Sequence, residues 1–177
     1  MQSHLHIHGT RHAAKTHIRL SSAIPLTTIT YTVKNVRQKI NMRSEITTAI
    51  FPLPVYGLSN GQIFLRLLFG YTHNGVQLAQ TNLSCFVCFT SDDVPTKPPH
   101  VLTFEGTTLE VISQTGAVSD HHAFLPGFAV PLGLSTGSAA FCPDVTKHIH
   151  NDELVVRGTI RTRLVNPPIS SYNVGCS

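Results

Sequence analysis

The stretch QIFLRLLFGYTH, residues 62–73, gives the clearest indication of the fold. Its apolar residues recur at every second position, and successive side chains of a β-strand point to opposite faces of a sheet. The predicted core face holds Ile63, Leu65, Leu67, Phe69 and Tyr71. Asn-Gly pairs stand on both sides of the stretch, and Asn-Gly is the strongest short-range signal for a tight turn between strands. We therefore predict a half-buried strand between two turns.

A second alternating stretch, ELVVRGTIRTRL, covers residues 153–164 and follows Asn151-Asp152, a pair typical of a turn. One face of this predicted strand holds Leu154, Val156, Gly158, Ile160, Thr162 and Leu164. The opposite face holds Val155, Arg157, Thr159, Arg161 and Arg163. The first set should anchor the strand in the core. The three arginines should form a basic stripe on the outer face.

The rest of the chain also favours strands and turns over helices. Charged residues make up only 12% of the sequence, apolar residues 41%, and there are 11 Pro and 12 Gly. No window shows a sustained apolar period of 3.6 residues. Further strands are predicted over residues 27–36, 45–51, 81–90, 100–104, 107–114 and, as a short edge strand, 138–143, with a long ordered loop over 124–137. Seven to eight short strands describe an all-β fold, an antiparallel β-sandwich or jelly roll.

The predicted organisation is a single domain, because 177 residues are too few for two well-packed ones. We expect a basic, His-rich irregular arm over residues 1–24, the sandwich over 25–166 and an extended tail over 167–177. No stretch approaches 18 consecutive apolar residues, and the N-terminus lacks the apolar segment of a secretory signal. We therefore expect a cytoplasmic protein that does not enter a membrane.

Two of the four cysteines, Cys85 and Cys88, lie three positions apart in the predicted strand 81–90. At a period of two they point to opposite faces, so they should neither form a redox pair nor share a metal ion. We interpret them as ordinary strand residues, which fits a reducing compartment.

The histidines offer the sharpest metal hypothesis. His148 and His150 are two residues apart and would share one face of a strand, with Asp152 or Glu153 as a third ligand. They stand just before a predicted turn, however, which favours exposed turn histidines. His121 and His122 are adjacent, and fit a loop best.

A second histidine cluster lies near the N-terminus, at His4, His6, His8 and His12. Such a run binds transition metals weakly in solution without that being its role. The sequence contains no phosphate-binding glycine loop and no H-E-x-x-H. We therefore predict a protein that is not an enzyme, with no cofactor and no metal.

Several segments resemble, in order, the strands of one known family. They are ITYTVKNVRQKI (29–40), TNLSCFVCF (81–89), TTLEVISQTG (107–116), HHAF (121–124), STGSAAFCP (135–143) and HNDELVVRGTIRTRL (150–164). Together they resemble the TRAF-C domain, a member of the wider MATH family. Asn82 replaces the usual histidine, the first strand lacks the usual tryptophan, and FLPGFAVPLG (124–133) lacks the usual serine cluster.

The resemblance implies an eight-stranded antiparallel sandwich that binds short extended peptides of partner proteins and often trimerises. Arg66 matches the basic residue that meets an acidic peptide side chain, and Leu68 replaces an aromatic hydroxyl. Thr136 and Gly137 match a Ser-Gly pair that contacts the peptide. The resemblance therefore implies a non-catalytic adaptor module. The usual peptide specificity does not carry over, because the serine cluster has no counterpart.

The charge distribution supports a different alternative. The first 44 residues hold seven of the 13 Lys and Arg residues and no carboxylate. A basic arm before a jelly roll is typical of a viral capsid or attachment subunit, with Arg11, Lys15 and Arg19 contacting nucleic acid inside a virion. A solvated leader explains the same charges, because they are spread out rather than clustered.

Overall fold

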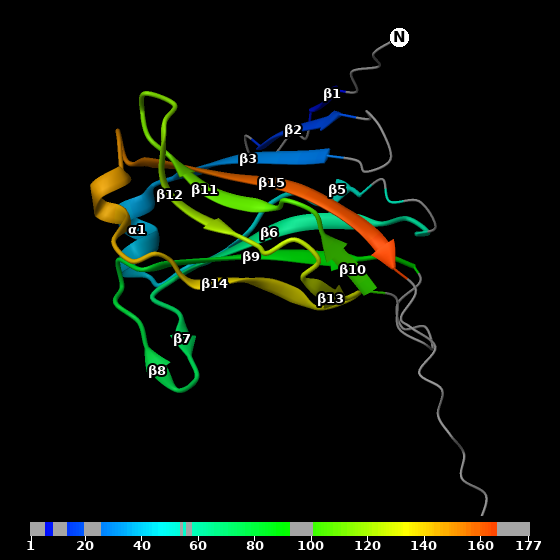
Figure 1. Cartoon of the computed structure of the whole chain (residues 1–177). Coiled ribbons are helices and arrows are strands. Elements are labelled where there is room, and N and C mark those ends of the chain that lie inside the picture. The colour runs from blue at the N-terminus through cyan, green and yellow to red at the C-terminus, as the bar shows by residue number, and fades with distance from the viewer. Residues whose placement is uncertain are drawn as a thin grey trace, which may run out of the picture.

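The computed structural model describes residues 6–8, 14–19, 26–53, 55, 58–92 and 101–165, with the backbone alone for 6–8 and 14–19. These residues form an antiparallel β-sandwich of two main sheets, which confirms the predicted all-β class (Figure 1). The two helices of the described chain have six and four residues, too short to cross a membrane.

The first sheet is built around a long closing strand. Its strands are β1 (His6–His8), β2 (Ala14–Arg19), β3 (Leu26–Lys34), β15 (Glu153–Val165), β10 (Val101–Phe104), β11 (Thr108–Ile112), β12 (Val118–Ala123) and β13 (Ala129–Pro131). One edge of β15 pairs with β3, and its other edge pairs first with β11 and then with β10. Strands β12 and β13 continue the sheet beyond β11 and β10.

The second sheet has the order β14–β9–β6–β4, with β5 also paired to β6. Its bounds are Ser135–Cys142 for β14, Leu83–Thr90 for β9, Gln62–Phe69 for β6, Glu45–Thr47 for β4 and Phe51–Pro52 for β5. A small hairpin of β7 (Thr72–His73) and β8 (Val76–Gln77) follows β6. Helix α1 (Val36–Asn41) and the 3₁₀ helix η1 (Val145–His148) lie together at one end of the sandwich (Figure 1).

The core lies between the two sheets and uses the alternation seen in the sequence. Both faces predicted to be apolar supply it, with Ile63, Leu65, Leu67 and Phe69 from β6 and Leu154, Val156 and Ile160 from β15 all buried. Tyr71 lies beyond the end of β6 and is half-buried. In β9, Cys85 lies in the core and Cys88 lies on the opposite face, as predicted from the spacing.

Two of the three predicted turns are tight. Asn74 and Gly75 join β7 to β8 with positive φ angles of 48° and 77°. Asn151 and Asp152 also have positive φ, and the backbones of His150 and Glu153 exchange two hydrogen bonds across them. Asn60 has a positive φ too, but β5 ends at Pro52, so the connection before β6 is much longer than a two-residue turn.

Several element boundaries differ from those predicted. The predicted strand 27–36 ends at Lys34, because Asn35 adopts a left-handed conformation (φ 53°) and the chain enters α1. The predicted loop 124–137 contains β13, and the edge strand begins at Ser135 rather than at residue 138. His121 and His122, predicted in a loop, lie in β12 because this strand pairs with β11 along its length. The expected irregular arm contains β1 and β2.

Candidate functional site

A groove of about 490 Å³ opens on the outer face of the second sheet. Its walls include Glu45 of β4, Phe64 and Arg66 of β6, Cys88 of β9, and Leu134 and Ser135 at the start of β14. These residues alternate with core residues on their strands, so the groove side chains point away from the core. Four of the five strands of the sheet, β4, β6, β9 and β14, therefore contribute to one surface.

Arg66 occupies a central position on this face and is held there by Glu45. Its Nε lies 2.5 Å from one carboxylate oxygen of Glu45 and its Nη2 lies 3.0 Å from the other. This bidentate contact holds the pKa of Glu45 below, and that of Arg66 above, its ordinary value. A guanidinium has five N–H donors, so Nη1 still has donors for a ligand.

The register shows which of the predicted peptide-binding residues share this face. Arg66, Phe86 and Gly137 form one row across β6, β9 and β14. Leu68 also lies on β6, on the same side as Arg66, but is buried at 8% exposure. Thr136 pairs with the core residue Val87, so it lies on the opposite face of the sheet from Gly137.

Gly137 is at a place where no side chain fits. A Cβ there would lie 2.0 Å from the carbonyl oxygen of Cys85 and 2.6 Å from the Cα of Phe86. The glycine therefore lets β14 lie close against β9. This close approach brings the start of β14 to the groove, where Leu134 and Ser135 form part of the wall.

Sequence reasoning missed the other groove residues. The alternation of residues 62–69 does place Phe64 on the outer face, and the alternation of residues 83–90 places Cys88 there too, but neither pattern shows that the two residues line one groove. The partner of Arg66 had no such signal, because the pairing of Glu45 with Leu68 depends on the register between β4 and β6.

The basic residues of the alternative hypothesis lie elsewhere. Lys15 and Arg19 belong to β2 and pair with Thr30 and Leu26 of β3, so their backbone is part of a sheet. Arg11 lies outside the described residues.

The predicted basic stripe on β15 is largely neutralised, which corrects the sequence interpretation. Arg157 Nε lies 2.6 Å from a carboxylate oxygen of Glu110, and Arg163 Nε lies 2.9 Å from one of Glu105. Glu110 lies on β11 and Glu105 follows β10, and the sequence pattern did not show that these two strands pair with β15. Arg161 is exposed.

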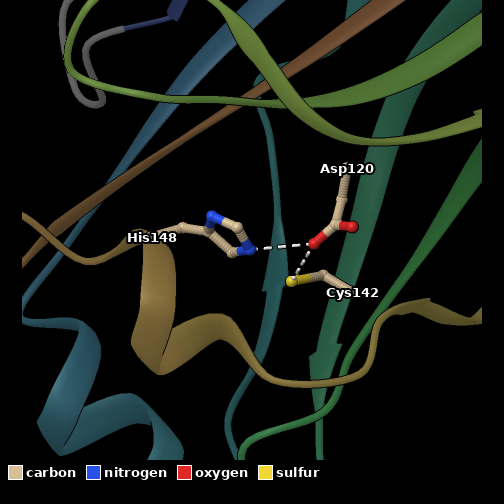
Figure 2. Close-up of side chains that lie close together, drawn as sticks. All are labelled: Asp120, Cys142 and His148. Atoms are coloured by element: carbon tan, nitrogen blue, oxygen red, sulfur yellow. Dashed lines mark hydrogen bonds and ion pairs between the residues drawn. The ribbon is translucent and has the colours of Figure 1, made fainter.

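A second cluster, which we call the edge cluster, consists of Asp120, Cys142 and His148 (Figure 2). It lies where β12 of the first sheet meets the end of β14 of the second, with η1 closing over it. His148 Nε2 and Cys142 Sγ both contact the same carboxylate oxygen of Asp120, at 2.8 Å and 3.2 Å. His150 belongs to the neighbouring turn and lies outside this cluster.

Local structure explains how the edge cluster forms. The register of β14 against β9 shifts between Ser138 and Cys142. The side chains of Asn82 and Ser84 donate hydrogen bonds to the Ala139 carbonyl at this shift, at 2.8 Å and 2.6 Å. Two residues after β14, Asp144 caps η1 by accepting a hydrogen bond from Thr146 N.

Helix η1 then carries His148 back over the end of β14. The His148 side chain is only 15% exposed. The expectation of an exposed turn histidine is therefore wrong for this residue, because an acid from β12, far away in the sequence, lies beside it.

The electrostatics of the edge cluster do not produce an activated thiol. Burial raises the pKa of Cys142 to about 12, and the hydrogen bond to Asp120 and the charge of that carboxylate act in the same direction. Asp120 stands between the thiol and the imidazole, whereas a nucleophilic cysteine needs the histidine as its direct base. What the cluster offers is one oxygen, one sulfur and one nitrogen within 4.8 Å of one another.

No protein-family model matches the sequence, and no curated protein matches it. The resemblance of residues 29–164 to TRAF-C domains therefore stays a prediction.

Proposed function

We propose that this protein is a non-catalytic interaction module that binds an extended, acidic peptide segment of a partner protein. The observation that supports this proposal is the groove on the outer face of the second sheet, with Arg66 held at its centre. Sheet faces and edges with alternating pockets are a common way of recognising extended chains.

The dimensions of the groove suit a short extended segment. Its lining residues come from β4, β6, β9 and β14, which are neighbours in the sheet. At a spacing of about 4.8 Å between strands, the groove spans about 14 Å, which four or five extended residues cover. Its volume of about 490 Å³ accommodates a few side chains of such a segment.

The chemistry of the lining selects the ligand. Phe64 and Leu134 provide apolar surface, and Leu134 is 56% exposed. Arg66 supplies a positive charge whose orientation is fixed by Glu45, while its Nη1 donors face no partner among the hydrogen bonds of the described chain. A peptide with one Asp or Glu beside small apolar residues complements this surface.

The groove also supports a role without catalysis. Among the described lining residues there is no histidine, and the two opposite charges, Glu45 and Arg66, are engaged with each other. Burial raises the pKa of the Cys88 thiol, which disfavours the thiolate that a nucleophile requires. None of these groups is a general base with a pKa near neutrality.

The experiment compares two peptide arrays. One displays ten-residue peptides with a single central Asp or Glu, and the other has Asn or Gln at the same position. We expect the full chain to prefer the acidic array and Arg66→Glu to abolish that preference. The fold should survive, because an ion pair with side chains 43% and 48% exposed stabilises a protein by about 1 kcal/mol at most.

Arg163→Glu is the matched control. Arg163 is also an exposed strand arginine paired with a glutamate, but it lies near the end of β15 on the first sheet. Both variants change the net charge equally, so a general electrostatic effect would weaken binding in both. Equal binding by wild type and Arg66→Glu, or an equal loss in Arg66→Glu and Arg163→Glu, would show that the groove is not the binding site.

The oligomeric state tests what the TRAF-C resemblance implies. Size-exclusion chromatography with light scattering of the full chain should show a homotrimer if the resemblance extends to assembly. A large closed particle that carries nucleic acid would instead support the alternative of a shell subunit.

A further inference from the structure

The geometry points to a zinc site at the edge cluster, formed by Asp120, Cys142 and His148, with a fourth position open to solvent. This site is separate from the groove, which lies on the outer face of the second sheet and is lined by other residues. The inference therefore does not depend on the proposed peptide binding.

The spacing of the three ligand atoms fits a tetrahedral ion. Zn²⁺ binds oxygen and nitrogen at about 2.0 Å and sulfur at about 2.3 Å, so tetrahedral ligand atoms lie roughly 3.3–3.8 Å apart. In the edge cluster the ligand atoms all lie within 4.8 Å of one another. The two shortest separations, 2.8 Å and 3.2 Å, are hydrogen-bond contacts to Asp120 that would lengthen by about half an ångström as the ion enters.

The ligand types select the metal. A thiolate and an imidazole are the ligands of zinc and similar transition metals, whereas Mg²⁺ and Ca²⁺ prefer oxygen alone. A divalent ion with the Asp120 carboxylate, the Cys142 thiolate and neutral His148 has no net charge. This balance matters at the edge cluster, because Cys142 is fully buried and an unbalanced charge there would be costly.

The proton balance of binding is simple. The Cys142 thiol loses its proton to solvent as the Zn–S bond forms, and the Asp120–thiol hydrogen bond breaks. His148 binds through Nε2, so the proton that Nε2 directs at Asp120 leaves this atom and their contact breaks, and the proton that remains on the neutral ring is on Nδ1. No oxidant or reductant takes part.

Three separate elements hold the ligands in place. Asp120 lies within β12, which pairs with β11, and Cys142 is the last residue of β14, paired with Leu83. His148 is the last residue of η1, whose first turn is capped. Ligands on hydrogen-bonded elements keep their geometry before the ion binds, which favours affinity.

The partial exposure of two ligands defines the open position. The side chains of Asp120 and His148 are 36% and 15% exposed, while Cys142 is fully buried. A water molecule or a group from a partner would complete the coordination. The bound ion would also join the two sheets, because β12 belongs to the first and β14 to the second.

The test uses the full chain, stripped of metal with a chelator and titrated with Co²⁺ alone. Cobalt in a tetrahedral site with a thiolate ligand gives a sulfur-to-metal charge-transfer band, which histidines alone do not give. We expect one equivalent of Co²⁺ to produce this band and Zn²⁺ to displace it. Saturating Zn²⁺ should also raise the melting temperature by about 5 °C or more.

Substitutions identify the ligands. Cys142→Ser should abolish the band, while Cys88→Ser and Cys176→Ser should keep it. Removing a residue that only hydrogen-bonds to a metal ligand already lowers metal affinity about 10–100-fold. Asp120 and His148 are ligands themselves, so Asp120→Asn and His148→Ala should weaken Zn²⁺ binding by at least about tenfold. His150→Ala, at the neighbouring turn, should leave the affinity unchanged.

Three results would overturn the site. A charge-transfer band that persists in Cys142→Ser would assign it to another cysteine. Metal binding without any such band would place the ion on other residues, such as the N-terminal histidines. Unchanged Zn²⁺ affinity in Asp120→Asn would also place the ion on other residues. This test holds even if Cys142→Ser fails to fold, because Asp120 is partly exposed and its substitution should leave the fold intact.

Discussion

At the scale of single residues, Gly137 is the position that leaves the least room for a side chain among the described glycines. Its missing side chain would overlap the backbone of β9 at 2.0 Å, and backbone atoms cannot rotate away as a flexible side chain does. Gly137→Ala should therefore lower the free energy of unfolding by about 3 kcal/mol, measured by urea denaturation. Ala140→Val is the control, since Ala140 is exposed on the same strand and the change should cost less than about 0.5 kcal/mol. Equal stability of both variants would contradict the close approach of β14 to β9.

The groove and the edge cluster also differ in whether their residues could be predicted from the sequence. Arg66 stood out because a charge in an apolar alternating strand has to point away from the core. The edge cluster gave no such signal, because Asp120, Cys142 and His148 are brought together only by the meeting of β12, β14 and η1. The spacing of His148 and His150 therefore suggested His150 as the neighbour of His148, whereas the structure places Asp120 and Cys142 beside it.

At the scale of elements, α1 depends on a cap from a distant part of the chain. The residue before the helix, Asn35, makes no side-chain capping hydrogen bond. Instead Asp152 accepts hydrogen bonds from Val36 N through its carbonyl and from Arg37 N through its carboxylate, at 3.1 Å and 2.9 Å. The turn before β15 thus completes the first turn of α1.

Asp152→Ala should lower the free energy of unfolding by about 1 kcal/mol, the usual cost of losing a helix cap. Asp152→Asn should cost less, because asparagine keeps the acceptor and tolerates the positive φ of 61°. Chemical denaturation with circular dichroism measures both changes. If Asp152→Asn is as destabilising as Asp152→Ala, the carboxylate contact to Arg37 N is not what stabilises α1.

Elements with strong alternation were predictable, and elements without it were not. Strands β6 and β15 were found from sequence because one face of each is apolar over its length. Strand β12, VSDHHA, is largely exposed and exists because its backbone pairs with β11. Helix α1 buries only Val36 and Ile40, one apolar pair four residues apart, which is too little to show a helical period.

At the scale of the whole molecule, Gly158 and Leu65 mark where the two sheets pack against each other. Gly158 lies on β15 of the first sheet, and a Cβ there would be 3.2 Å from Leu65 Cδ2 on β6 of the second. The neighbouring atoms are the ends of the Ile160 and Leu109 side chains, at 3.0 Å and 3.4 Å. A larger residue at this position therefore has to displace side chains between the sheets rather than within one sheet.

Gly158→Val should lower the free energy of unfolding by about 1–3 kcal/mol, since it overpacks the core. Leu65→Ala alone should cost about 2–5 kcal/mol, because it leaves a cavity at a fully buried position. The double variant should be more stable than the sum of the two losses predicts, by about 1 kcal/mol or more, as the added valine fills the space that Leu65 vacates. Leu83→Ala, another buried leucine of the second sheet, is the matched control and should combine additively with Gly158→Val. Additivity in both pairs, measured by urea unfolding, would show that β15 and β6 do not face each other through Gly158, and the packing of the sandwich derived above would be wrong at its centre.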